Sequence, residues 1–430
     1  MLRALAHPVY RRLFLAQVVA LAGTGLATVA LGLLAYDLAG SGAGGVLGTV
    51  FAVKMVAYVA VAPVANAAVA RLPRRAVMVG ADVLRLVVAL GLPLAGEVWQ
   101  VYLLVFVLQS ASATFTPTFQ SVVPDVLPDE EDYTAALSLS RLAYDLEAVL
   151  SPVLAAALLL VAPAQALFGG TAVGFAASAL LVVTTTLPGR VPATPGSAAG
   201  PAAPFGRRVR HGARLLTSSP ALRPVLALNL AVAAAGSYVL VQTVVIVRDS
   251  YGRGDGTVAL LLAANGLGSM TAAFCLPRVL RRVPERRVML GGALLLPVAT
   301  ALVPLALRGS APGALLALAA LWVVVGLGWS AVETPVGRIV RRTVPTADLS
   351  AAFAAQFSLS HACWLIAYPL AGWLGGADAL GLGGTALVLA GLSAAAGIAA
   401  AALWPRTPAP GAPTPGAPIP VAVRTADPRP

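Results

Sequence analysis

The feature that most constrains this chain is a series of apolar runs, each about 20 residues long. Hydrophobic residues make up 59% of the sequence and charged residues 11%, whereas a soluble domain is nearer a quarter charged. A helix of about 20 apolar residues crosses the roughly 30 Å hydrocarbon core of a bilayer. The runs lack the alternating pattern of an outer-membrane barrel. The sequence therefore predicts an all-α membrane protein.

Twelve spans are expected, in two six-helix bundles. The first bundle, within residues 1–187, has spans near 14–36, 45–69, 77–95, 99–119, 135–161 and 165–187. The second, within 221–404, has spans near 221–247, 257–280, 288–307, 313–336, 351–376 and 379–404. Residues 188–220 are rich in Pro, Gly, Ala and Arg and predict a loop with at most a short amphipathic helix near 205–216. The proline-rich tail, 405–430, is expected to be disordered.

The distribution of arginine predicts the orientation. The chain carries a net charge of +12, and most of its arginines lie in the loops that face the same side as the N-terminus. On the other side there are only Arg248, Arg253 and Arg308. Because positive residues collect on the cytoplasmic side, we expect a multi-pass protein of the cell membrane with both termini in the cytoplasm. This pattern explains the charge better than nucleic-acid binding does.

The two bundles also resemble each other in sequence. "RRAVMVGA" at 74–81 and "ERRVMLGG" at 285–292 share four of eight positions, and each opens the third span of its half. "SLS" recurs at 138–140 and 358–360, near the start of the fifth span. Such echoes predict a duplication, with the two bundles related by a pseudo-two-fold axis, as in one large class of secondary transporters.

With these features the chain resembles the major facilitator superfamily, and in particular its bacterial drug and siderophore exporters. The similarity is carried by "HPVYRRLFLAQVVALAGTGLATVALGLLAYDLAGSG" in the first helix and by "SVVPDVLPDEEDYTAALSLSRLAYDLEAVLSPVLAAAL" before and within the fifth. It covers about residues 7–404, apart from the central loop. The resemblance implies alternating access between two bundles and export of small molecules.

Two motifs of that family occur in altered form. The loop G-x-x-x-D-R-x-G-R-R is replaced by "NAAVARLPRR", which keeps Arg71, Arg74 and Arg75 but has Ala70 in place of the acid. In the family that acid holds the halves closed on the cytoplasmic side. The helix-five motif G-x-x-x-G-P-x-x-G-G is replaced by "EAVLSPVLAA" at 147–156, which keeps small residues and a proline at Ser151 and Pro152.

Other classes of function lack support in the sequence. No lysine follows a glycine as in a phosphate-binding loop, so ATP hydrolysis is not expected. The glycines of "GTG" at 23–25 lie within a span, which favours close helix packing over dinucleotide binding. The histidines and the two cysteines do not have metal-ligand spacing. We therefore expect no enzyme activity, no cofactor and no metal.

Four charged residues are expected within the membrane: Lys54, Arg141, Asp145 and Glu147. Lys54 is the only lysine of the chain and stands in the apolar run "FAVKMVAYVAVAP". A charge at the bilayer centre costs about 2.5–3.5 kcal/mol on insertion scales, so such residues usually pair or mark a transport path. Arg141 and Asp145 are four residues apart and can pair with each other. We hypothesise that Lys54 pairs with Glu147 or Asp145 in one conformation; the alternative is a static ion pair.

A second group is expected at the cytoplasmic ends of the helices. Asp82 and Arg85, three residues apart, favour a structural or gate role, with the gate completed by Arg71, Arg74 and Arg75.

The function expected from all of this is a proton-coupled exporter of a small hydrophobic or cationic compound. The partners would be that substrate, protons and the lipid bilayer, with no nucleic acid, and the protein would be monomeric. An importer or facilitator of the same fold and a non-transporting membrane regulator or scaffold are the alternatives.

Overall fold

The computed structural model describes residues 2–61, 72–187, 214, 216–344, 349–376 and 379–405, and its regular elements there are helices. The N-terminal half comprises α1 (Leu2–Ala6), α2 (Pro8–Ala39), α3 (Ala43–Val56), the π-helical turn η2 (Ala57–Val61), α5 (Arg74–Gly91), α6 (Val98–Val126), α7 (Glu130–Leu159) and α8 (Gln165–Val183). Short 3-10 turns, η1 (Gly40–Gly42) and η3 (Leu92–Leu94), follow α2 and α5.

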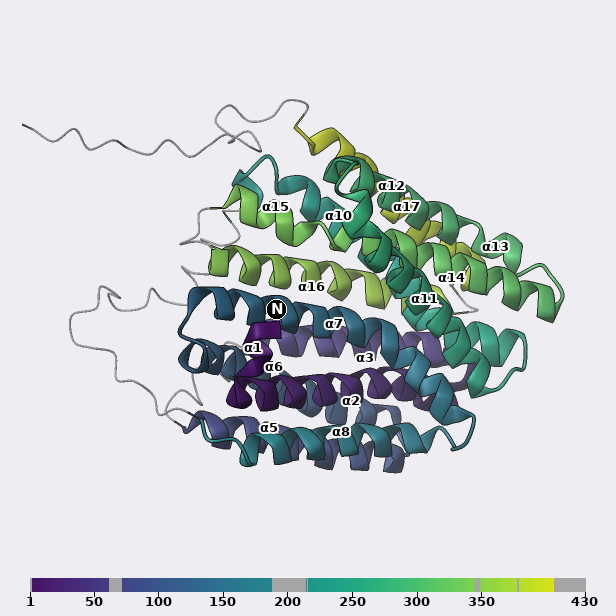
Figure 1. The fold of residues 1–430 in the computed structure, drawn as a ribbon. Coiled ribbons are helices and arrows are strands. Elements are labelled where there is room, and N and C mark those ends of the chain that lie inside the picture. Colours follow the sequence, from purple (N-terminus) through teal and green to yellow (C-terminus); the bar gives the residue numbers. More distant parts are fainter. Residues whose placement is uncertain are drawn as a thin grey trace, which may run out of the picture.

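The C-terminal half comprises α10 (Arg223–Val245), the π-helical turn η4 (Ile246–Ser250), α11 (Asp255–Val279), α12 (Glu285–Ala301), α13 (Val303–Ala306), α14 (Ala311–Glu333), α15 (Val336–Thr343), α16 (Leu349–Leu374) and α17 (Gly381–Leu403). Figure 1 shows the helices of each half lying together, with α3, α7, α11 and α16 toward the middle of the molecule. There α3 packs on α16 and α7 packs on α11, so the halves meet along these two pairs.

Nine stretches of the described chain are long and apolar enough to cross a membrane, and the first of them, Pro8–Val59, contains both α2 and α3. The expected all-helical membrane architecture is therefore confirmed for the described residues. The number of twelve spans, the domain boundaries and the pseudo-two-fold symmetry stay predictions. The expected helix near 205–216, the tail from 406, and Ala70 with Arg71 lie largely or wholly outside the described residues.

The ends of the helices differ in charge. The end at which α2, α5, α10, α12 and α16 begin is here called the arginine-rich end, since it carries residues such as Arg74, Arg223 and Arg286. The opposite end, called the arginine-poor end, carries Arg248 and Arg308. The positive-inside rule predicts that the arginine-rich end is cytoplasmic.

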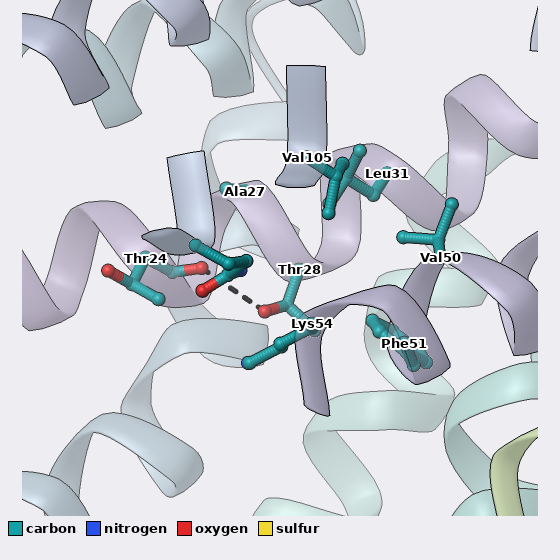
Figure 2. Close-up of a pocket in the computed structure, with 9 residues that line it drawn as sticks. Thr24, Ala27, Thr28, Leu31, Val50, Phe51, Lys54 and Val105 are labelled. Carbon is teal, nitrogen blue, oxygen red and sulfur yellow. Dashed lines mark hydrogen bonds between the residues drawn. The ribbon is translucent and has the colours of Figure 1, made fainter. Parts of the chain in front are cut away.

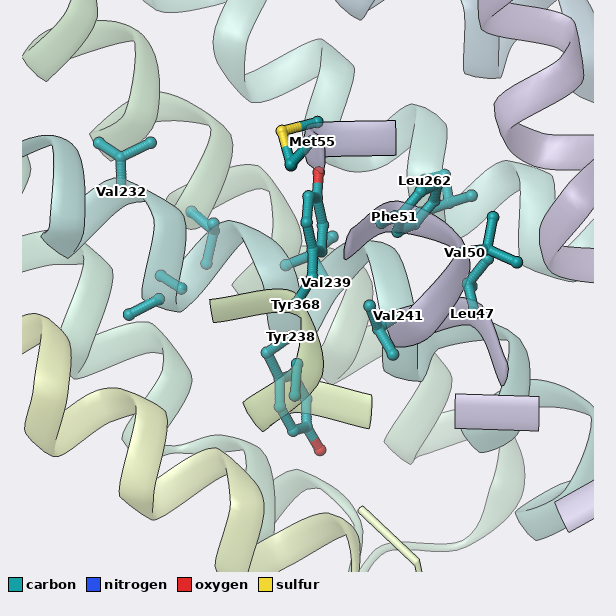
Figure 3. Close-up of a cluster of buried hydrophobic side chains, with 14 of the residues drawn as sticks. Leu47, Val50, Phe51, Met55, Val232, Tyr238, Val239, Val241, Leu262 and Tyr368 are labelled. Carbon is teal, nitrogen blue, oxygen red and sulfur yellow. The ribbon is translucent and has the colours of Figure 1, made fainter. Parts of the chain in front are cut away.

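The halves share one apolar core. Figure 3 shows side chains of α3, such as Leu47, Phe51 and Met55, beside Tyr238 of α10 and Tyr368 of α16. This core joins residues far apart in sequence, so packing between the halves contributes directly to the stability of the fold.

Glycines let α3 and α16 approach closely at the arginine-poor end. A Cβ on Gly48 would lie 2.6 Å from the carbonyl oxygen of Tyr368, and a Cβ on Gly372 would collide with the backbone of Gly44. Gly44 and Gly48 are four residues apart, the spacing that lets membrane helices pack backbone against backbone. Nearby, the indole Nε1 of Trp373 donates to Thr49 Oγ1 over 3.1 Å.

An ion-pair cluster joins the halves at the same end. Arg248, in η4, pairs with Asp37 of α2 at 3.2 Å and also with Asp255 of α11. Its guanidinium carbon lies 4.9 Å from the ring centre of Tyr36. Together with the glycine contacts, this cluster closes the arginine-poor end in the present conformation.

Candidate functional site

Lys54 lies in a small cavity between helices of the N-terminal half. The cavity is lined by polar side chains of α2 and α6, namely Thr24, Thr28 and Gln109, and by the apolar residues Ala27, Leu31, Val50, Phe51 and Val105. Figure 2 shows Lys54 beside Thr28, with Thr24 one turn away on the same helix. The free volume is about 10 Å³, which is room for about one water molecule. The present conformation therefore holds this cavity nearly closed.

The cavity lies deep in the helical bundle. Lys54 comes eleven residues after Ala43, the first residue of α3, which places it roughly 16 Å from the arginine-poor end at 1.5 Å per residue. Glu147 comes twelve residues before Leu159, the last residue of α7, or roughly 18 Å from the same end. The two residues therefore stand at a similar depth, and a group this deep needs an opposite charge or water nearby.

Glu147 and Ser151 lie against the backbone of α2 at Gly25. A Cβ at Gly25 would lie 2.9 Å from Glu147 Oε1 and would collide with the Ser151 side chain. Ser151 is buried, and its hydroxyl oxygen has no hydrogen-bond partner. Because Gly25 has no side chain, the carboxyl of Glu147 can reach the face of α2 that also carries the cavity residues Thr24 and Thr28. Pro152, the next residue of the expected helix-five motif, lies within α7.

Lys54 and Glu147 are near enough for the charge of each to influence the other, and their role as a pair stays a prediction. Glu147 also acts on the phenols of Tyr58 and Tyr144, and Lys54 acts on His361 of α16. Tyr58, about one turn after Lys54, contacts His361 and Phe357 of α16, so this part of the chain lies at the boundary between the halves. The side chains of Arg141 and Asp145, the other expected members of this site, lie outside the described residues, although α7 carries both positions.

Asp82 and Arg85 form a separate cluster inside the N-terminal half. Both are buried on α5 and pair with each other, and Ser178 of α8 donates to Asp82 Oδ2 over 2.7 Å. The Arg85 guanidinium lies between the rings of Phe115 and Phe175, 4.5 Å from each centre. The expected i, i+3 pairing is present, and its surroundings favour the structural alternative.

The remaining residues of the expected gate are at the arginine-rich end. Arg74 pairs with Asp125, which lies in the last turn of α6, and both side chains are partly buried. Arg75 is exposed, and Arg71 lies outside the described residues. The gate itself stays a prediction.

Sequence reasoning did not assign a role to the residues that face Lys54 from the C-terminal half. His361 and Phe357 of α16 pack against Tyr58, with ring centres 5.8 and 6.2 Å away. His361 Nδ1 lies 2.7 Å from the carbonyl oxygen of Phe357. Lone aromatic and histidine residues in apolar runs carry no sequence signal of a shared site, because the contact depends on packing between helices more than 290 positions apart.

The long apolar helices define a multi-pass membrane protein. The sequence profile of the Major Facilitator Superfamily matches residues 13–247 and, a second time, residues 226–426. The chain belongs to the major facilitator superfamily, as its sequence suggested.

Solved transporter structures share the fold at low sequence identity. A mutant of the nucleoside transporter NupG is 14% identical with a TM-score of 0.69, covering 92% of this chain and 100% of that chain. A D-xylose–proton symporter is 14% identical with a TM-score of 0.67, covering 93% of this chain and 98% of its own. A bacterial homologue of the human lysosomal transporter Spinster, in an inward-facing and unoccupied conformation, is 14% identical with a TM-score of 0.64, covering 92% and 94%. No curated protein matches the chain.

Proposed function

We propose that this member of the superfamily is a proton-coupled secondary transporter that works by alternating access, with Lys54 and Glu147 as its coupling pair. One observation carries the proposal: Lys54 lines a buried cavity beside α2, and the carboxyl of Glu147 lies against α2 at Gly25, at a similar depth in the bundle. Protonation of Glu147 would remove its attraction for Lys54, and a change in that attraction can shift the equilibrium between two conformations.

The first candidate is export of a small hydrophobic or cationic compound in exchange for protons. In this scheme Glu147 binds either a proton or the substrate, and the direction of transport is taken from the resemblance to bacterial exporters. The protein would act as a monomer in the cell membrane, with both termini in the cytoplasm.

The second candidate is cotransport, in which a proton and the substrate bind together and move in the direction that their gradients set. The presence of Lys54 in the cavity favours this scheme, because a cation in the binding site attracts a substrate with an anionic head. A regulator or scaffold without transport is the alternative from another class.

Purified protein in liposomes that contain a pH-sensitive dye tests the proposal. We expect candidate compounds to cause proton movement in wild type and not in Glu147→Gln, whereas a scaffold would move no protons with any compound. Reporter fusions after residues 200 and 410 test the topology, and an outward-facing signal from either fusion would contradict it.

A further inference from the structure

The cavity beside Lys54 combines one cation with mostly apolar walls. Five of its lining residues, Ala27, Leu31, Val50, Phe51 and Val105, have apolar side chains. Gln109, which is 4% exposed, lines the same cavity, and its Oε1 has no hydrogen-bond partner. A buried polar atom without a partner costs stability, so this oxygen favours a water molecule that donates to it. Once enlarged in another conformation, a cavity with this lining suits an amphipathic molecule with a charged head and an apolar body.

A row of aromatic rings leads from this cavity into the C-terminal half. Phe51 contacts Tyr368 with ring centres 4.8 Å apart, Tyr368 contacts Trp364 at 5.0 Å, and Trp364 contacts Trp329 at 5.0 Å. These four residues are here called the aromatic ladder. The first belongs to α3 and the others to α16 and α14, so the aromatic ladder crosses the boundary between the halves.

Phe51 both lines the cavity and contacts Tyr368 of the other half, and alternating access would separate the halves at this crossing. The contact between Phe51 and Tyr368 would then be lost, and both ring faces would become free. Aromatic pairs are favoured over simple burial of the same area, so a substrate ring that takes the place of one partner compensates for the lost contact. An aliphatic chain would bury area without this compensation.

We propose that the transported compound is an aromatic carboxylate, with its carboxylate at Lys54 and its ring on the aromatic ladder. This inference rests on the proposed transport function and names the substrate class of that site. The Lys54 ammonium forms a charge-assisted hydrogen bond with a carboxylate. An amine head in the same place would meet the Lys54 charge, which disfavours the cationic compounds expected from the sequence.

In this proposal the protonation state of Glu147 determines whether the Lys54 ammonium can bind the substrate carboxylate. With Glu147 ionised, its carboxylate and the substrate carboxylate compete for one ammonium. With a proton on Glu147, Lys54 is left for the substrate, so one proton and one anion bind together. The other ionisable groups that act on this pair are Tyr58 on η2, Tyr144 on α7 and His361 on α16; Arg141 and Asp145 of α7 have side chains outside the described residues.

Three probes with the same ring and different heads test the proposal: 2-naphthoate, 2-naphthamide and 2-naphthylmethylammonium. Decanoate serves as the aliphatic acid. Binding to the purified full-length protein is measured by equilibrium dialysis with labelled probes. We expect 2-naphthoate to bind at least ten-fold more tightly than each of the other three. Tightest binding of the amine, or binding of none of the four, would overturn the proposal.

Variants test whether the carboxylate head binds at Lys54 and whether the ring binds on the aromatic ladder. Lys54→Met should remove the preference for 2-naphthoate over 2-naphthamide, while Lys54→Arg keeps it and shows that the fold is intact. Glu147→Gln should bind 2-naphthoate as tightly at pH 8 as at pH 6, whereas wild type binds it more weakly at pH 8. Trp364→Leu should weaken the binding of 2-naphthoate and of 2-naphthamide by the same factor. An unchanged preference in Lys54→Met would contradict the inference.

The same measurements separate this inference from the transport proposal. If the amine binds tightest and its addition moves protons in liposomes, the chain is a proton-coupled cation transporter, and only the substrate class proposed here is wrong. If no compound moves protons, the transport function fails as well.

Discussion

The polar residues inside the two halves differ in kind. Of the described residues, the buried charged side chains, Asp82, Arg85 and Asp132, all belong to the N-terminal half, which also holds Lys54 and Glu147. The buried polar side chains of the C-terminal half are amides and hydroxyls, such as Asn229 and Gln356. Carboxylates and lysine can bind and release protons, whereas amides and hydroxyls of this kind stay neutral. We propose from this comparison that the N-terminal half carries the proton coupling, while the C-terminal half contributes mainly contacts to the body of the substrate.

Of the described buried amides with an unpaired side-chain atom, Gln109 lies in the N-terminal half and the other four, Asn229, Gln242, Asn265 and Gln356, lie in the C-terminal half. Both polar side-chain atoms of Asn229 and the Oε1 of Gln356 are buried without hydrogen-bond partners. Unpaired buried groups destabilise the conformation that contains them. A second conformation that pairs these amides with substrate or water would therefore gain free energy, which is how neutral groups can contribute to alternating access without binding a proton.

The largest effect, on protein stability, is expected within the N-terminal half, where the buried Asp82–Arg85 ion pair supports the fold. Asp82→Asn leaves the buried Arg85 without a counter-charge, and breaking a buried pair by removing one partner costs about 3–5 kcal/mol. We expect a clear fall in the melting temperature of the purified protein, measured by tryptophan fluorescence. Arg85→Met added to Asp82→Asn should recover most of the loss. A single variant as stable as wild type would show that this pair does not support the fold.

A matched pair of glycine substitutions compares the halves directly. In Gly25→Ala the new methyl collides with Ser151 and displaces Glu147, whereas in Gly236→Ala it lies 2.6 Å from Trp364 and displaces the aromatic ladder. We expect Gly25→Ala to lower proton-driven accumulation about ten-fold or more, at roughly 1.4 kcal/mol per ten-fold. Gly236→Ala should mainly raise the KM of transport for the substrate, because the displaced aromatic ladder binds it less well.

Gly169→Ala is the control, because no atom lies within 4 Å of its added methyl. It should transport like wild type. If Gly25→Ala and Gly236→Ala change KM and accumulation in the same way, the proposed division between the halves is wrong.

The smallest effect is expected at the arginine-poor end. Asp37→Asn removes one ion pair of Arg248, which keeps Asp255 as a partner. A partly exposed pair contributes about 0.2–1 kcal/mol, so the population open at this end should rise at most about five-fold. Distances between spin labels on α2 and α11 measure that population, with Asp249→Asn as the control for a lost charge nearby. A lower open population in Asp37→Asn would contradict the closing role of this pair.

Much of the fold follows from local sequence features, and part of the site does too. Apolar runs predict helices because each must satisfy its own backbone hydrogen bonds in lipid. Lys54 and Glu147 stand out because each is an ionisable residue where the pattern requires a neutral one. Glu147 lies against α2 at Gly25, but the sequence offered either acid of α7, Asp145 or Glu147, as the partner of Lys54.

The contribution of α16 could not be predicted in the same way. His361, Trp364 and Tyr368 are ordinary residues for an apolar helix, and their role depends on which face of α16 meets α3. Gly44, Gly48 and Gly372 fix that contact, but glycines are frequent in membrane helices and do not identify their partners in sequence. Only the packing of the two halves brings the aromatic ladder to the cavity.

The central claim is that Glu147 carries the coupling proton beside Lys54. The most direct test compares two transport modes of Glu147→Gln in liposomes, with Glu97→Gln, at an exposed helix start, as the control. Glutamine cannot exchange a proton, so we expect substrate exchange at zero gradient to persist while accumulation driven by a pH gradient falls to background. Glu97→Gln should retain both modes. Full gradient-driven accumulation by Glu147→Gln would show that the coupling proton binds elsewhere.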